Sequence, residues 1–196
     1  MKNLKHSFRS HGRNLGMGTH PCPGSNDHYR GILSGAVLIA IIMALSSCVV
    51  FSRENSVSVY NEGRALAQKG DIDAAIPFFE KAVRLSPNYA LAHYALGRAY
   101  LYKESKMKDA VRELSYSVRC DRRLAKGYFY LGIAYLFSKK YDRAIHSFND
   151  AYSTDRTYYP ALYNIASIYD KIGQTQKARQ FFMRYFEEMH RSEEDF

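Results

Sequence analysis

The feature that most constrains the fold of this chain is a pattern of small and aromatic residues that recurs every 34 or 35 positions. Shifting the sequence along itself by these steps aligns four small residues: Gly63, Gly97, Gly132 and Ala166. Three more columns follow the same steps: Leu66, Tyr100, Tyr135, Tyr169; Ala75, Ala110, Ala144, Ala178; and Phe79, Leu114, Phe148, Phe182. A fixed period of this length is typical of stacked structural repeats, each too small to bury its apolar face alone.

Each period contains two short predicted helices separated by a turn. The turn signals lie at residues 69–71, 105–106, 138–140 and 172–174. We expect helix pairs at 56–69 with 72–85, 90–103 with 107–119, 125–138 with 141–153, and 159–172 with 175–190. Side-chain oxygens at the starts of the second helices are placed to cap them: Asp71 or Asp73, Asp142 and Thr175.

These columns resemble the tetratricopeptide repeat. The family has a small residue in the first helix, an aromatic residue or Leu three positions later, an Ala near the start of the second helix and an aromatic residue four positions after it. The resemblance implies an all-α fold, a right-handed α-solenoid of about four helix-turn-helix repeats. The repeats would span 56–89, 90–124, 125–158 and 159–190, followed by an acidic tail at 191–196. A generic helical bundle is the alternative.

The sequence of the N-terminal region predicts a targeting signal rather than a folded domain. Residues 1–30 are polar and basic, and residues 32–45 form an uncharged apolar run. This run is shorter than the ~20 residues of a membrane span and fits the core of a signal peptide. It ends in Leu45-Ser46-Ser47-Cys48, which resembles the bacterial lipobox. The resemblance implies cleavage after a signal peptide at 1–47 with a long basic leader, a diacylglycerol on the Cys48 sulfur, and a tether at 48–55.

The same segment also permits an uncleaved anchor. Ile32 to Phe51 covers 20 residues, and the basic residues before it would stay cytoplasmic. Among lipoproteins, Val49 after the cysteine resembles the pattern sent to the outer membrane. We therefore expect a lipid-anchored protein of the bacterial cell envelope, on the outer membrane facing the periplasm. A single-pass inner-membrane anchor is the alternative.

The tetratricopeptide resemblance also implies a concave groove lined by the first helix of each pair. Aromatic side chains are expected to project into it at Tyr60, Tyr94, Phe129 and Tyr163. One turn further on come Arg64, Arg98 and Ile133, with Tyr102 and Phe137 at the edge and Lys126 near the mouth. Such a groove suits a peptide of a partner protein, because aromatic faces bury apolar groups and Arg pairs with carboxylates.

One variant of the family binds the carboxylate ends of chaperones through Lys and Asn at set positions. The equivalent Asn positions here read Asn61, Ala95, Tyr130 and Asn164, so we do not expect that specificity. In the last helix, Phe181 and Met189 are expected to lack cover, which indicates a second interface for self-association or for a partner.

The sequence predicts a protein that is not an enzyme. His93, His146 and His190 are the histidines after Cys48, and they belong to no HExxH, CxxC or phosphate-loop motif. We expect no cofactor, no metal site and no nucleic-acid partner. The expected role is a scaffold or assembly factor for a pilus or secretion pore, or for outer-membrane or peptidoglycan machinery. The alternative is an adaptor or secretion chaperone held by an uncleaved N-terminal helix.

Overall fold

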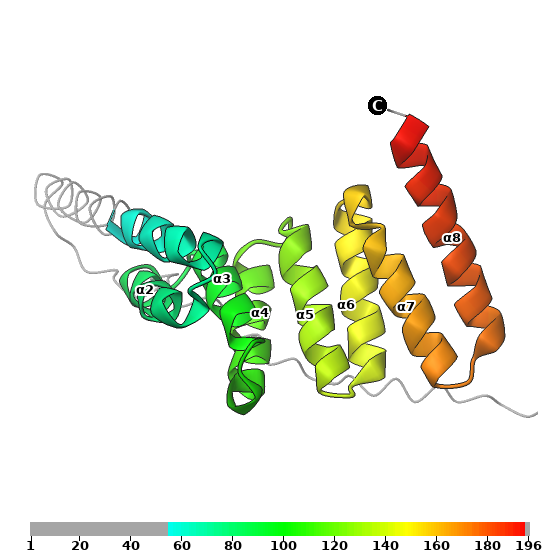
Figure 1. Ribbon diagram of the computed structural model, residues 1–196, viewed down its shortest axis with the longest axis horizontal. Coiled ribbons are helices and arrows are strands. Elements are labelled where there is room, and N and C mark those ends of the chain that lie inside the picture. The colour runs from blue at the N-terminus through cyan, green and yellow to red at the C-terminus, as the bar shows by residue number, and fades with distance from the viewer. Residues whose placement is uncertain (1–54, 195–196) are drawn as a thin grey trace, which may run out of the picture.

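The computed structural model describes residues 55–194 as consecutive helix pairs, with no strand among them (Figure 1). The prediction of an all-α solenoid is confirmed, whereas Cys48 and the segment before it lie outside the described residues. A first helix covers residues 55–68. The others are α2 Ile72–Leu85, α3 Ala90–Tyr100, α4 Met107–Cys120, α5 Ala125–Phe137, α6 Tyr141–Thr154, α7 Pro160–Lys171 and α8 Thr175–Glu194. Two 3₁₀ turns, η1 Glu104–Lys106 and η2 Arg156–Tyr158, lie in connections.

Packing follows the order of the chain. The extensive contacts lie within the pairs α3 with α4, α5 with α6 and α7 with α8, and between pairs at α2 with α3, α4 with α5 and α6 with α7. Figure 1 shows this succession as a row of helices running from the cyan end to the red end. The core is therefore a line of clusters between neighbouring helices rather than one central cluster.

The small-residue column sets the spacing between the two helices of a pair. A Cβ atom on Gly97 would lie 2.6 Å from Leu114 Cγ and 3.0 Å from the Leu114 backbone nitrogen. A Cβ atom on Gly132 would lie 2.7 Å from Cδ1 of Phe148. These distances are well inside ordinary contact, so the first helix of a pair approaches the second closely only because the side chain is missing.

The helix ends differ from the prediction in local ways. Asp71 caps α2, since its side chain accepts a 3.0 Å hydrogen bond from the backbone nitrogen of Ala74. The prediction that Asp142 caps α6 is wrong, because the residue before α6 is Lys140 and Asp142 lies inside the first turn. At this position the negative charge of Asp142 still interacts favourably with the positive end of the helix dipole. Helix α3 ends at Tyr100, before its expected end, and η1 forms within the longer connection of this repeat.

A buried polar link joins α3, α4 and the turn before α3. His93 is 5% exposed and Glu113 is 7% exposed. The His93 ring lies 2.8 Å from Glu113 Oε2 through Nδ1 and 2.8 Å from the Pro87 carbonyl oxygen through Nε2. Arg112 Nε donates to the other carboxylate oxygen at 3.1 Å. Every polar atom of the link therefore has a partner, as buried polar groups require.

The described helices show no membrane-crossing candidate: none of them combines the length and the apolar content that a span needs.

Candidate binding cleft

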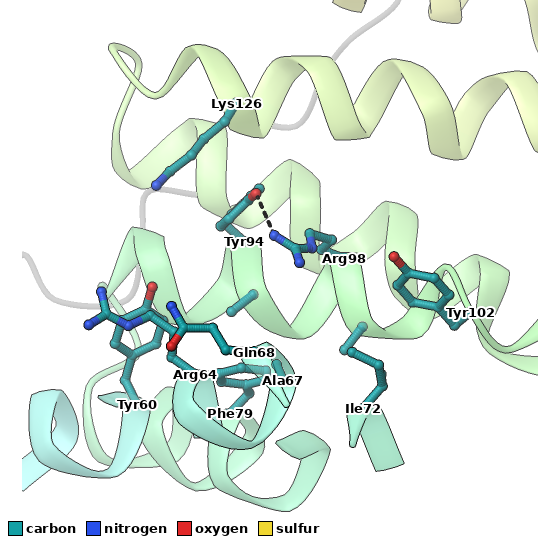
Figure 2. A pocket seen from close by; sticks show the side chains of 12 residues that line it. Tyr60, Arg64, Ala67, Gln68, Ile72, Phe79, Tyr94, Arg98, Tyr102 and Lys126 are labelled. Carbon is teal, nitrogen blue, oxygen red and sulfur yellow. Dashed lines mark hydrogen bonds between the residues drawn. The ribbon is translucent and has the colours of Figure 1, made fainter. Parts of the chain in front are cut away.

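A cleft of about 240 Å³ lies between the first helices of the first three pairs (Figure 2). Its walls come from the helix 55–68, from α3 and from the start of α5, and α2 contributes to its floor. The lining residues are Tyr60, Arg64, Ala67, Gln68, Ile72, Phe79, Tyr94, Ala95, Arg98, Ala99, Tyr102 and Lys126. Residues that are far apart in the sequence meet here because equivalent positions of successive repeats stack in space.

Three cations converge on this cleft. Arg64 comes from the helix 55–68, Arg98 from α3 and Lys126 from α5. No aspartate or glutamate is among the lining residues. Figure 2 shows these three side chains around the same opening. The cleft therefore presents positive charge that no acid in its lining neutralises, and its chemistry suits an anionic group.

Arg98 is held in place by aromatic neighbours. Its NH1 atom donates a 3.4 Å hydrogen bond to the Tyr94 hydroxyl, drawn as the dashed line in Figure 2. Its guanidinium carbon lies 5.7 Å from the centre of the Tyr130 ring. The hydrogen bond that Arg98 donates to Tyr94 raises the pKa of the Arg98 guanidinium above its ordinary value, so Arg98 stays charged. Lys126 Nζ lies 5.0 Å from the centre of the Tyr94 ring, a cation–π distance.

The expectation that Tyr60 and Tyr94 project into the groove needs correction. Each is only 7% exposed. The Tyr60 ring packs at 5.3 Å from the Tyr89 ring, and the Tyr94 ring packs at 5.6 Å from the Tyr130 ring. Burial raises the pKa of both phenols, which therefore stay neutral. The two rings form the wall of the cleft and the contact between repeats at the same time.

The cleft brings together part of the predicted groove. Six of the predicted residues line it: Tyr60, Arg64, Tyr94, Arg98, Tyr102 and Lys126. Phe129 does not line it and packs instead against Phe148 and Tyr158. Ile133 is half-buried against the cluster around Phe148. Phe137 is 62% exposed and Tyr163 is 50% exposed, but neither belongs to this cleft.

Gln68 also lines the cleft, and it is not among the residues predicted from the sequence. It follows Arg64 by four positions, which places both residues on one face of the helix 55–68. This spacing of four residues would have predicted Gln68 as a groove residue once Arg64 was assigned to the groove. Ile72 and Phe79 come from α2 and complete the apolar part of the lining.

The expectation that Phe181 is uncovered is wrong. Phe181 is half-buried, and its ring packs 5.5 Å from the Tyr169 ring of α7. Met189 is also half-buried. The strongly exposed apolar side chains of α8 are instead Met183, at 57%, and Phe186, at 47%.

The described residues contain no group of three or more His, Cys, Asp or Glu side chains that would hold a metal ion. His93 is engaged in the buried link to Glu113, and the nearest acid to His146 is Asp150 at 3.8 Å on the same helix.

Comparison with known proteins finds relatives that share part of this architecture. Protein bimA of Emericella nidulans is 27% identical over 99 residues, which cover 50% of this chain and 12% of that protein. Heat shock protein STI1 of Saccharomyces cerevisiae is 31% identical over 121 residues, which cover 61% of this chain and 20% of that protein. The chain thus spans a fifth or less of the length of these curated relatives.

Solved structures agree with the fold. The crystal structure of MamA superposes with a TM-score of 0.68 at 23% identity, over 71% of this chain and 81% of that one. The first TPR of Spaghetti (RPAP3), bound to the HSP90 peptide SRMEEVD, superposes with a TM-score of 0.58 at 18% identity, over 61% of this chain and 94% of that one. At these identities the likeness concerns the fold alone.

The repeat columns are recognised by two family models. The model described as "TPR repeat" matches residues 63–103, and the model described as "Tetratricopeptide repeat" matches residues 125–158 and 159–187. The matched segments contain the close-packed glycines Gly97 and Gly132. Together with the stacked helix pairs, these matches show that the chain belongs to the tetratricopeptide repeat family.

Proposed function

We propose that this protein is a non-enzymatic scaffold that captures an acidic segment of a partner protein in the cleft between its first three repeats. The observation that carries the proposal is the convergence of Arg64, Arg98 and Lys126 on a cleft whose lining contains no acid. Arginine forms paired hydrogen bonds with a carboxylate, and the exposed ring of Tyr102 offers apolar surface beside it. Tetratricopeptide repeats are protein–protein interaction modules, and the Spaghetti repeat domain binds a peptide with acidic residues.

The contacts that we expect in this cleft differ from those of the family variant that binds the carboxylate ends of chaperones. The column that carries the family's binding Asn reads Ala95 and Tyr130 in repeats two and three. Ala95 lines the cleft as a small apolar residue, and Tyr130 packs against Tyr94 and Arg98. The cleft therefore offers cations and apolar surface without side-chain amides at those two positions. We expect it to select acidic residues that have apolar neighbours.

A pair of labelled heptapeptides tests the acidic-segment proposal by fluorescence polarisation with the full chain. One peptide carries three Glu residues, two Leu residues and a free carboxyl end, and the other replaces Glu by Gln and has an amidated end. We expect the acidic peptide alone to bind, and its affinity to fall with added salt because the contact is ionic. Arg98→Gln and Arg64→Gln should each weaken binding roughly tenfold, as loss of one charge-assisted hydrogen bond predicts.

Lys108→Gln is the matched control, because Lys108 is an exposed cation on α4 that does not line the cleft. Equal binding of the two peptides would refute the acidic-segment proposal. An equal loss of binding in the Lys108 variant would show that net charge, rather than the cleft, attracts the peptide.

The place of action is a separate proposal that rests on the sequence. We propose that Cys48 carries a lipid and tethers the repeats to the bacterial envelope, on the outer membrane facing the periplasm, as an assembly factor for an envelope machine. Support comes from the uncharged run at 32–45 followed by the lipobox-like Leu45-Ser46-Ser47-Cys48. Incorporation of radioactive palmitate that is abolished by Cys48→Ala is the expected result, and labelling that persists in this variant would contradict it.

The alternative is an adaptor or secretion chaperone on an uncleaved N-terminal helix. The mass of the chain isolated from membranes distinguishes the two. Cleavage leaves Cys48 as the first residue, with added acyl mass, whereas an anchor leaves residues 1–47 in place.

A further inference from the structure

The C-terminal end of the helix stack exposes a ring in a column that earlier repeats bury or half-bury. Tyr163 on α7 is 50% exposed, while its counterparts Tyr60 and Tyr94 are each 7% exposed and Phe129 is half-buried. The difference has a visible cause. Tyr60 is covered by Tyr89, which directly precedes α3, and Tyr94 is covered by Tyr130 on α5. Tyr163 occupies the same place in the last pair of described helices, and its ring contacts lie only within that pair, on α8.

Helix α8 shows the same pattern in a second column. Phe186 is 47% exposed, whereas its counterparts Val118 and Tyr152 are 8% and 4% exposed and Val83 is half-buried. Met183, one turn before Phe186, is 57% exposed. Residues three positions apart lie on one face of a helix, so Met183 and Phe186 form a single apolar stripe. We call this stripe together with Tyr163 the terminal face, and residues 55–191 leave it uncovered.

The opposite end of the described stack is polar. Glu62 is exposed on the helix 55–68, while the residues in the same column of the later repeats are buried: Leu96 at 4%, Leu131 at 7% and Ile165 at 0%. Ser58 is likewise exposed where later repeats bury a small residue. An apolar terminal face gains nothing by packing on such a polar surface. Head-to-tail stacking of two copies is therefore disfavoured.

The charges of α8 are arranged for an antiparallel partner. Lys177, Arg179 and Arg184 lie in its first part, where residues 175–186 contain no acid. Residues 187–194 contain four glutamates against one arginine. This order is the reverse of the one that stabilises an isolated helix, which prefers acids at its beginning and bases at its end. Two α8 helices that run antiparallel and cross at Met183 and Phe186 would place each basic part against an acidic part.

We propose that the terminal face binds a second copy of this chain, so that two α8 helices pair antiparallel about a two-fold axis near Met183 and Phe186. The contact is isologous and closes on itself, which gives a dimer rather than a filament. It buries Tyr163 and the α8 stripe. It leaves free the helix 55–68, α2 and α3, which supply most of the cleft lining and lie at the other end of the row of helices (Figure 1).

Multi-angle light scattering of the full chain tests the proposal, in detergent micelles if the chain partitions with membranes. We expect two chains per particle. The double variant Met183→Glu with Phe186→Glu should raise the dissociation constant roughly 30-fold or more, as loss of central apolar anchors predicts. Both residues are exposed in the single chain, so circular dichroism should be unchanged. Phe137→Glu is the matched control, because Phe137 is an equally exposed apolar residue that lies outside the terminal face.

A charge exchange tests the antiparallel arrangement independently. Arg179 and Glu187 are both exposed and flank the stripe on opposite sides of its centre. Arg179→Glu and Glu187→Arg should each weaken the dimer, and the chain that carries both changes should regain it. A monomeric wild-type chain, a dimer that survives the Met183 and Phe186 changes, or an equal loss in the Phe137 variant would overturn the proposal. A double charge variant that stays dissociated would overturn the antiparallel pairing.

Discussion

The substitution Gly97→Ala tests directly whether the close approach of α3 to α4 stabilises the solenoid. In a helix without near neighbours, Ala in place of Gly stabilises the fold by about 1 kcal/mol. Here the added Cβ would lie 2.6 Å from Leu114 Cγ, 3.0 Å from the Leu114 backbone nitrogen and 3.2 Å from the Ala110 carbonyl oxygen. Two of these atoms belong to the main chain of α4, so the helices must separate, and overpacking of this kind costs about 1–3 kcal/mol.

Because main-chain atoms are involved, we take the upper part of that range, about 2–3 kcal/mol. Less the gain of about 1 kcal/mol from helix propensity, Gly97→Ala should lower the free energy of unfolding by about 1–2 kcal/mol, which corresponds to a fall in Tm of roughly 3–8 °C. Urea and thermal unfolding followed by circular dichroism measure both quantities. Gly132→Ala is the comparison, because the closest atoms there all belong to the Phe148 ring, which can rotate away. It should cost less than Gly97→Ala. A Gly97→Ala chain as stable as the wild type would refute the argument, since helix propensity would then outweigh the helix contact.

Two further predictions concern the buried and half-buried polar groups. Glu113→Ala should destabilise the fold by about 3 kcal/mol in urea unfolding, because it removes the 2.8 Å partner of the buried His93 Nδ1; a loss below about 1 kcal/mol would contradict this. A hydrogen bond of 2.7 Å from the Tyr152 hydroxyl lowers the pKa of Glu188. The stability that this pair contributes is therefore complete above the pKa of Glu188 in the unfolded chain, and it is lost as the pH falls through the pKa of Glu188 in the folded chain. Tyr152→Phe should make the free energy of unfolding depend less steeply on pH in the acid range. An unchanged pH dependence would contradict the role of this pair.

The sequence predicts the helix pairs well because the repeat columns are packing contacts. Gly97 and Gly132 recur at the period of the fold, and the structure places each against the second helix of its own pair. The same logic brings Arg64 and Arg98 to one cleft, since equal positions of successive repeats stack. Periodicity therefore places Arg64 and Arg98 in the candidate site from the sequence alone.

Burial within a column could not be predicted from the period. Tyr60 and Tyr94 are covered by Tyr89, directly before α3, and by Tyr130 on α5, and neither position holds an aromatic residue in every repeat. On α8, neighbouring residues differ by about 100° around the helix axis. Phe181 and Phe186, five positions apart, therefore point about 140° apart, and the rotation of α8, which the period does not fix, decides which of them is exposed.

The linear order of the helix contacts has a consequence for how the molecule opens. The extensive contacts join only elements that are adjacent along the chain, from α2 through to α8. Each boundary between repeats is therefore a place where cooperativity can divide, and the last boundary, between α6 and α7, has the whole cleft on one side and α8 on the other. The contacts of the His93 ring with Glu113 and with the Pro87 carbonyl oxygen stabilise one such boundary, because they join α3 and α4 to the turn that precedes α3. Amide exchange should be slowest beside this boundary and fastest at α8, so the molecule would fray from its C-terminal end while the cleft keeps its shape.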